Sequence, residues 1–139
     1  MSGEFVDTNV LLYAHDSSAG PKRARAAALV ERLADERRGL LSSQVLMEFY
    51  VAATRKLPRP LDQRAAARIV EDFGTWPVFL PAVADVLEGA RLAQRYRIHF
   101  WDAMILRAAI ALEADVVWSE DLSSGQAYDG LEVRNPFKG

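Results

Sequence analysis

The chain has 139 residues, a formal charge of −2 at pH 7, 50% hydrophobic and 26% charged residues, and no cysteine. This length predicts one domain, residues 1–139, with its own hydrophobic core, and the composition excludes a disordered chain. The missing cysteines exclude a disulfide framework, a thiolate zinc site and a cysteine nucleophile. The charge excludes a strongly basic nucleic-acid binder of the histone type.

The ends and apolar runs of the sequence predict where the protein works. The first five residues lack a basic region and an apolar region, so we predict no secretory signal. No apolar run approaches the roughly 20 residues that span a bilayer. Because the absence of cysteine is also compatible with a reducing compartment, we expect a cytoplasmic protein without a membrane contact.

Short apolar strands alternate with helices along the chain. Strands are predicted at 3–7, 40–42, 78–80, 115–119 and 131–134. Helices are predicted at 9–15, 21–38, 43–56, 61–76, 83–96 and 101–113, with Pro21 as a first helical residue, Gly39 as a stop, and Ser43 and Asp62 as N-caps. This order predicts an α/β fold: a mainly parallel sheet with helices on both faces, which binds ligands at the carboxyl ends of its strands.

Two acidic residues follow predicted strands. Asp7 ends the first strand, and Asp121 comes about two residues after the fourth. If these strands are neighbours, the two carboxylates converge at one edge of the sheet. Taken alone, Asp7 could be only a helix N-cap, and Asp121 could be a solvated loop acid, with Glu120 as the alternative functional residue.

Two further acids lie on apolar helix faces. Glu48 has Val45, Val51 and Ala52 as its neighbours three and four positions away, and an ionised carboxylate there is costly unless it is paired or bound to a metal. Its alternative is a pair with an arginine or a path to water. Asp102 opens an apolar helical segment, so its alternative is an N-cap.

The joint placement of the four acids is more informative than any one of them. Four like charges at one site repel strongly, and bound cations would make the arrangement tolerable. Carboxylate oxygens suit hard ions such as Mg²⁺ or Mn²⁺. The matching chemistry is metal-assisted displacement at phosphorus.

Four segments resemble the motifs of the PIN-domain family, in the family's order. They are FVDTNV at 5–10, SSQVLMEFY at 42–50, FWDAMI at 100–105 and SEDL at 119–122. NPF at 135–137 is similar to the end of many VapC-type toxins. The resemblance implies a three-layer, Rossmann-like PIN domain with a mainly parallel five-stranded sheet in the order 3-2-1-4-5, flanked by helices.

The resemblance also implies a function. It is that of a Mg²⁺- or Mn²⁺-dependent endoribonuclease, a homodimer, and the toxin of a type II toxin–antitoxin pair that a cognate small antitoxin inhibits. Carried over by motif, the catalytic and metal-binding residues are Asp7, Glu48, Asp102 and Asp121, supported by Thr8, Asn9 and Ser119. The family more often has Thr at Ser119, and many members carry a further acid at Ser123, which leaves the number of metal ions open.

Partner contacts are predicted from charge and apolar faces. The candidate contacts with RNA phosphates are Lys22, Arg23, Arg25, Arg55 and Lys56, because phosphate contacts dominate affinity for RNA, although such clusters are usually solvated faces. An antitoxin could insert an arginine or lysine among the acids and bind as an amphipathic helix in a groove between residues 45–53 and 29–33. Trp76, Trp101 and Trp118 are predicted core residues.

Other functions fit the sequence less well. A phosphatase of the haloacid-dehalogenase type needs a second aspartate where this chain has Asn9, and no suitable lysine follows a later strand. A PIN-like scaffold that binds RNA or protein without cutting would not need all four acids. A housekeeping PIN nuclease fits the motifs as well as a toxin does. The sequence identifies neither the RNA target nor the antitoxin.

Overall fold

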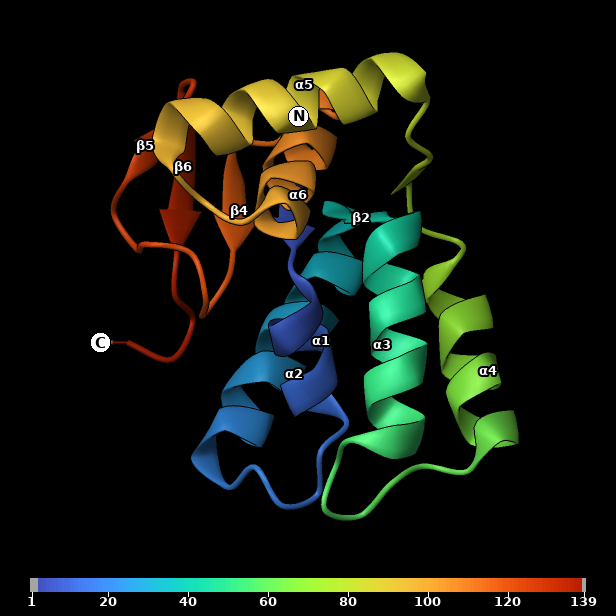
Figure 1. Cartoon of the computed structure of the whole chain (residues 1–139). Helices are drawn as coiled ribbons and strands as arrows, with labels where there is room; N and C mark the ends of the chain where they lie inside the picture. The colour runs from blue at the N-terminus through green and yellow to red at the C-terminus, as the bar shows by residue number, and fades with distance from the viewer. Residues whose placement is uncertain (1–2, 139) are drawn as a thin grey trace.

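The computed structural model describes residues 3–138, in which one sheet is flanked by helices (Figure 1). The strands are β1 (Glu4–Val6), β2 (Gly39–Ser42), β3 (Val78–Phe79), β4 (Val116–Trp118), β5 (Ala127–Tyr128) and β6 (Leu131–Arg134). The helices are α1 (Thr8–Ala14), α2 (Pro21–Glu36), α3 (Ser43–Arg55), α4 (Gln63–Phe73), α5 (Val83–Tyr96) and α6 (Phe100–Ala111). Helix α1 packs on α2 and α3, α3 packs on α4, and α5 packs on α6.

The sheet has the order β3-β2-β1-β4-β6-β5, and all its pairs are parallel except β5–β6. The predicted order 3-2-1-4-5 is therefore confirmed, with β6 as the predicted fifth strand. The prediction of five strands was wrong because it missed β5. This strand has only two residues and pairs through a hairpin at Asp129 and Gly130, which both have positive φ, and two residues are too few to show an alternating pattern.

The central strands are buried, as expected where helices cover a parallel sheet. Every residue of β1 and β2 is buried, and the core beside them includes Phe5, Leu41, Phe49 and Leu106, each with 0% exposure. No helix within residues 3–138 is both long and apolar enough to cross a membrane. Strand β1 lies between β2 and β4, so its carboxyl end opens at the middle of one sheet edge.

Two predicted helix boundaries are wrong. Helix α2 ends at Glu36, where Arg37 takes a left-handed φ of 55°. Gly39 does not stop this helix but begins β2, under the ring of Trp76: a Cβ at Gly39 would lie 2.2 Å from that ring. The N-cap of α3 is Ser42 rather than Ser43, because Ser42 has the extended backbone that an N-cap needs and accepts a hydrogen bond from the next turn.

The other predicted elements are confirmed: α5 and β6 have the predicted bounds, and the rest are shifted by at most three residues at either end. Asp62 caps α4 by accepting a hydrogen bond from the Ala65 backbone at 2.8 Å, although this helix covers residues 63–73 rather than 61–76. Trp101 is 55% exposed, so its assignment to the core was wrong. Trp76 and Trp118 are half-buried and pack against the core cluster.

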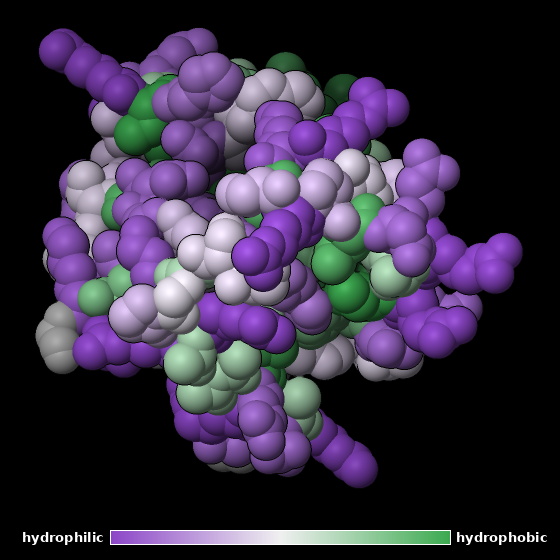
Figure 2. Space-filling model, turned by 90° about the horizontal axis from the view of Figure 1, so that it is seen from below, coloured by the Kyte–Doolittle hydropathy of each residue, from purple (hydrophilic) through white to green (hydrophobic). Residues whose placement is uncertain are grey.

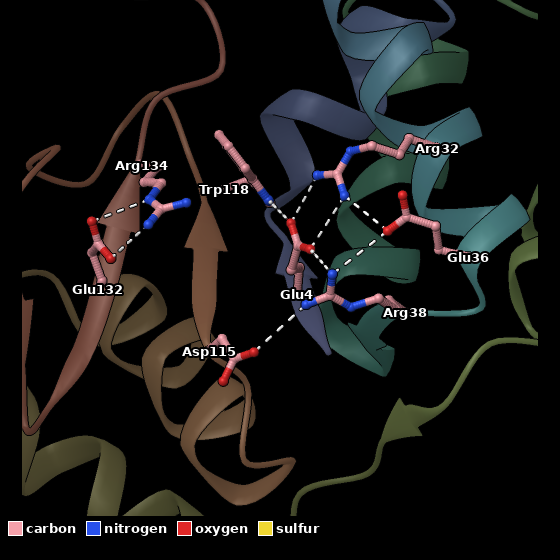
Figure 3. A network of polar contacts seen from close by, with 8 residues as sticks. All are labelled: Glu4, Arg32, Glu36, Arg38, Asp115, Trp118, Glu132 and Arg134. Carbon is pink, nitrogen blue, oxygen red and sulfur yellow. Dashed lines mark hydrogen bonds and ion pairs between the residues drawn. The ribbon is translucent and has the colours of Figure 1, made fainter. Parts of the chain in front are cut away.

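Glu4, in the first position of β1, connects four parts of the chain at the amino end of the sheet (Figure 3). Its buried carboxylate accepts hydrogen bonds from Arg32 of α2 at 2.9 and 3.3 Å and from the indole of Trp118 at 2.8 Å, and it pairs with Arg38 at 3.3 Å. Burial raises the pKa of Glu4, but the hydrogen bonds from Arg32 and Trp118 and the two positive charges outweigh it. The pKa is therefore lowered overall.

We predict that Glu4→Gln lowers the free energy of unfolding by about 1.5–3 kcal/mol at pH 7, because hydrogen bonds to a charged group contribute about that much. The depressed pKa means that this stabilisation is present above the unfolded value of 4.5 and is lost as the pH falls through the folded value. Urea unfolding at pH 7 and pH 3 measures both effects. Glu132→Gln is the control: its pair with Arg134 is exposed, so the change should cost less than about 1 kcal/mol.

Candidate active site

Asp7 and Asp121 meet at the carboxyl edge of the sheet. Asp7 directly follows β1, and Asp121 lies three residues after the end of β4, whose last residue pairs with the last residue of β1. The side-chain nitrogen of Asn9 donates to Asp7 Oδ2 at 3.3 Å and to Asp121 Oδ2 at 3.1 Å. One neutral amide therefore connects the two carboxylates.

Asp7 is both a helix N-cap and a member of the acidic cluster, so its two sequence interpretations coexist. Its Oδ1 accepts a hydrogen bond from the Thr8 backbone at 2.7 Å, and its Oδ2 accepts one from the buried hydroxyl of Ser119 at 2.7 Å. The side chain is only 4% exposed. Burial and, to a smaller extent, the charges of Asp121 and Glu48 together raise the pKa of Asp7 to about 6, against the lowering effect of its hydrogen-bond donors.

Glu48 comes from α3 and is held by neutral donors. Its Oε1 accepts a hydrogen bond from the hydroxyl of Thr8 at 2.6 Å, and its Oε2 accepts one from the amide of Gln44 at 3.3 Å. Gln44 also donates to the Trp101 carbonyl at 3.0 Å, which ties α3 to α6. No arginine pairs with Glu48 in the described chain, which excludes the arginine pair, whereas the path to water exists because Glu48 is partly exposed in the cleft. The sequence analysis missed Gln44, although its position four residues before Glu48 on one helix face was a readable signal.

Asp102 lies in the first turn of α6 but does not cap it. The N-cap is His99, whose Nδ1 accepts a hydrogen bond from the Trp101 backbone at 3.3 Å. Within residues 3–138, the Asp102 carboxylate forms no hydrogen bond. Burial raises its pKa, as do the charges of Asp121 and Glu48, while His99 lowers it. Asp102 is therefore charge-coupled to the cluster with oxygens free for a ligand.

The loop that carries Asp121 is held by its neighbour. Glu120 accepts a hydrogen bond from Tyr13 at 2.8 Å and forms an ion pair with Lys22, and its backbone donates to Asn9 Oδ1 at 3.1 Å. The Ser119 hydroxyl accepts hydrogen bonds from the backbone N–H groups of Asp121 and Leu122, at 3.2 Å each. Glu120 therefore anchors this loop rather than facing the cluster. Lys22, a predicted RNA contact, is instead paired with Glu120.

Glu48 and Asp121 open onto a cleft of about 480 Å³, which is also lined by Thr8, Asn9, Lys56 and apolar side chains. Asp7 and Asp102 do not line this cleft. Of the other predicted RNA contacts, Arg23, Arg25 and Arg55 are exposed. His15 does not line this cleft, and its ring packs edge-on against Phe49 and Phe73.

An apolar groove of about 470 Å³ adjoins the cleft, between α3 and α4. It is lined by Leu46, Met47, Tyr50, Val51, Ala67 and Val70. Met47 and Val51 line the cleft as well. Figure 2 views the molecule from the side toward which β4 and β6 point in Figure 1, and hydrophobic surface gathers on its right, the side of α3 and α4. The predicted wall at 29–33 was wrong for this groove, because none of these residues lines it.

The donor set of the cluster fits a hard divalent cation, because it consists of carboxylates. Among residues 3–138, no three acidic, histidine or cysteine side chains converge closely enough to hold one ion between them. This spacing is compatible with Mg²⁺, which usually keeps several waters and takes one or two carboxylates from the protein. Asp7, Glu48, Asp102 and Asp121 are the residues that could hold such ions.

The raised pKa of Asp7 predicts a pH-dependent effect of Asp7→Asn without divalent metal. A group whose folded pKa is raised contributes stability below its unfolded value of 3.8, and this stability is lost as the pH rises through about 6. As the pH rises from 4 to 7, the unfolding free energy of Asp7→Asn should therefore increase relative to that of the wild type by on the order of 2–3 kcal/mol. Chemical unfolding in EDTA across this range measures it. A difference that is constant with pH would contradict the prediction.

Comparisons with solved structures place the chain among known folds. VapC20 of Mycobacterium tuberculosis, a toxin that cleaves the sarcin–ricin loop, aligns with a TM-score of 0.67 and 16% identity over 86% of this chain and 90% of its own. VapBC2 of Rickettsia felis, bound to a DNA fragment from its promoter, aligns with a TM-score of 0.64 and 16% identity over 95% of this chain and 97% of its own. FitAcB of Neisseria gonorrhoeae aligns with a TM-score of 0.63 and 18% identity over 96% of this chain and 98% of its own. At this identity the likeness establishes the fold.

The sequence comparisons establish the family. No curated protein matches the chain in sequence. The family model for the PIN domain matches residues 5–125, which include all four acids of the cluster. The resemblance noted from the motifs is thereby confirmed, and the chain belongs to the PIN-domain family.

Proposed function

We propose that the chain is a metal-dependent endoribonuclease whose catalytic residues are Asp7, Glu48, Asp102 and Asp121. The observation that carries this proposal is the absence of basic partners. Other carboxylates, such as Glu4, Asp85 and Glu120, form ion pairs with arginine or lysine. In the described chain none of the four forms such a pair, although the charges of Glu48 and Asp121 are close enough to raise the pKa values of Asp7 and Asp102. A cluster of this kind suits a bound cation and a phosphodiester substrate.

Mg²⁺ or Mn²⁺ bound here would lower the pKa of a water and stabilise the charge that develops on the phosphate. The protein's own residues position the carboxylates for this role. Asn9 holds Asp7 and Asp121 at a fixed separation, and Thr8 and Gln44 fix the two oxygens of Glu48. Ser119 orients Asp7 and supports the loop of Asp121. Lys56, Arg55 and Arg23 are candidate contacts for the RNA phosphates.

We predict that replacing any one of the four acids by alanine abolishes RNA cleavage while the protein stays folded, and that EDTA stops the wild type. Asn9→Ala should reduce cleavage by about 10–100-fold, the usual effect of removing a group that orients a metal ligand. Glu120→Ala should retain more activity than Asp121→Ala, since Glu120 is paired with Lys22.

The measurement is cleavage of total RNA with Mg²⁺ or Mn²⁺, alongside thermal melting of each variant. Arg64→Ala on α4, an exposed position away from the acids, is the control and should cut as the wild type does. Full activity in excess EDTA would exclude the metal mechanism. Normal cleavage by Asp121→Ala together with inactive Glu120→Ala would show that the fourth acid is Glu120.

We further propose that the chain is the toxin of a toxin–antitoxin pair. Its motifs resemble those of VapC-type toxins, and its fold resembles that of the toxin VapC20. The apolar groove between α3 and α4 suits an amphipathic helix of an antitoxin, and the adjoining cluster suits an inserted arginine, which pairs bidentately with carboxylates. We place the protein in the cytoplasm, where its RNA substrate would be.

We propose a homodimer as the working form. The apolar side chains Leu80, Val83, Val86 and Leu87 gather around the start of α5 and are 45–79% exposed. Exposed apolar clusters of this kind mark interaction sites, and this one is separate from the antitoxin groove.

We predict that expression of the wild-type chain slows bacterial growth, that Asp7→Ala does not, and that co-expression of a short neighbouring gene restores growth. Ala67→Glu offers a sharper test, because Ala67 lines the groove but not the acidic cleft. This variant should stay toxic and escape the antitoxin, because it places a charge in an apolar interface. Growth curves at verified expression, with and without the neighbouring gene, measure these outcomes. Equal toxicity of wild type and Asp7→Ala, or none from either, would contradict the toxin assignment.

A further inference from the structure

A second groove, of about 530 Å³, runs between α2 and the segment that follows β6. Its walls include Arg25, Ala28 and Arg32 of α2, Trp118 at the end of β4, and Asn135 and Lys138 of the C-terminal segment. None of these residues lines the cleft onto which Glu48 and Asp121 open. The groove is therefore a separate site, and nothing in the catalytic proposal uses it.

The groove and the acidic cluster share one edge of the sheet. Strands β4 and β6 are parallel, and Trp118 pairs with Arg134 at their carboxyl ends. Asn135 thus leaves β6 at the edge where Ser119 leaves β4. Only two residues, Ser119 and Glu120, lie between Trp118 of the groove and Asp121 of the acidic cluster in the sequence. A linear ligand that crosses the loop at 119–121 would contact both sites.

The charge of the groove is positive and partly unneutralised. Arg25 and Arg32 lie two turns apart on one face of α2, with the small Ala28 between them leaving room for a ligand. Arg32 is held by Glu4 and Glu36, whereas Arg25 and Lys138 form no ion pair within the described chain. No acidic residue lines the groove. On a chain with a net charge of −2, these cations form a local site for an anion.

The groove also presents an aromatic ring and an amide. Trp118 is half-buried, and its indole nitrogen is fixed by Glu4 at 2.8 Å, while the guanidinium of Arg134 lies 6.0 Å from its ring centre. Asn135 accepts a hydrogen bond from the Phe137 backbone through Oδ1 at 2.8 Å, which orients its side-chain amide. Phosphate-binding cations beside a fixed aromatic ring and an amide match single-stranded nucleic acid, whose bases stack on such rings.

We propose that this groove binds single-stranded RNA next to the segment that the acidic site cuts, with phosphates at Arg25 and Lys138 and a base against Trp118. The inference rests on the proposed nuclease function, because it assigns a contact to the same substrate. It also explains how an acidic protein with an acidic active site can hold a polyanion: attraction comes from a surface separate from the carboxylates.

Binding is tested on the full chain carrying Asp7→Asn, which prevents cleavage, with a fluorescent single-stranded RNA of about 12 nucleotides, within the range of known binding sites. Arg25→Glu/Lys138→Glu should weaken binding at least about tenfold and lower the slope of log affinity against log salt by about 1.4, for two lost phosphate contacts. The matched control is Arg64→Glu/Arg68→Glu on α4, which changes the net charge equally at two exposed arginines. It should change the affinity less than about twofold.

Tryptophan fluorescence gives a second measurement. RNA should quench the emission of the Asp7→Asn protein, and Trp118→Phe should remove most of that quenching, since the base would lie against this ring. Trp76→Phe should retain it, because Trp76 lies outside the groove, against Phe73. Thermal melting of each variant identifies losses that arise from unfolding.

Several results would overturn the inference. One is an undiminished affinity of the groove variant, and another is an equal loss in the α4 control, which would indicate only overall charge. A third is a protein that binds duplex DNA but not single-stranded RNA, if the groove substitutions weaken that DNA binding. Failure of the nuclease proposal is recognised separately: a wild type that binds RNA in the groove but cuts none with Mg²⁺ or Mn²⁺ retains the groove and loses the catalytic assignment.

Discussion

Repulsion between four carboxylates at one sheet edge is the constraint that organises this molecule. Asp7, Glu48, Asp102 and Asp121 come from two strand ends and two helices, and the parallel order β2-β1-β4 brings them together. The protein supports them with neutral donors, chiefly Asn9, Thr8, Gln44 and Ser119. Such donors fix the positions of the oxygens without neutralising their charge, which leaves the cluster suited to an external cation.

Glu4, in the same strand, is a buried carboxylate that is neutralised by basic partners instead of being held by neutral donors. It lies three residues before Asp7, at the other end of β1, and is nearly as buried, with 6% exposure against 4%. Two arginines and an indole neutralise and saturate it, and its pKa is lowered, whereas burial among neutral donors raises the pKa of Asp7. The contrast separates a carboxylate that ion pairs tie to neighbouring elements from one that has no basic partner in the described chain.

The sequence was sufficient for the order of the elements and for the expectation that the four acids lie near one another, because both depend on local patterns. Alternating short strands and helices determine a parallel sheet, and acids after strands or on apolar helix faces stand out from their neighbours. It was insufficient where a partner is distant: Trp118, which binds Glu4, lies 114 residues away, and Lys22, which binds Glu120, lies 98 residues away. Strand β5 was missed for another reason, since its pairing comes from a hairpin and not from a pattern of its own.

Helix α2 connects the two surfaces that a substrate would need. Lys22 in its first turn pairs with Glu120 and so holds the loop of Asp121, and its ammonium also lies over the rings of Tyr13 and Phe137. One to three turns further on, Arg25 and Arg32 line the basic groove. A ligand bound in the groove would therefore contact α2, the same helix whose Lys22 holds the loop of Asp121 through Glu120. Because the Lys22 pair is part of the folded scaffold, the distance between the two surfaces is fixed by helix geometry rather than by a flexible connection.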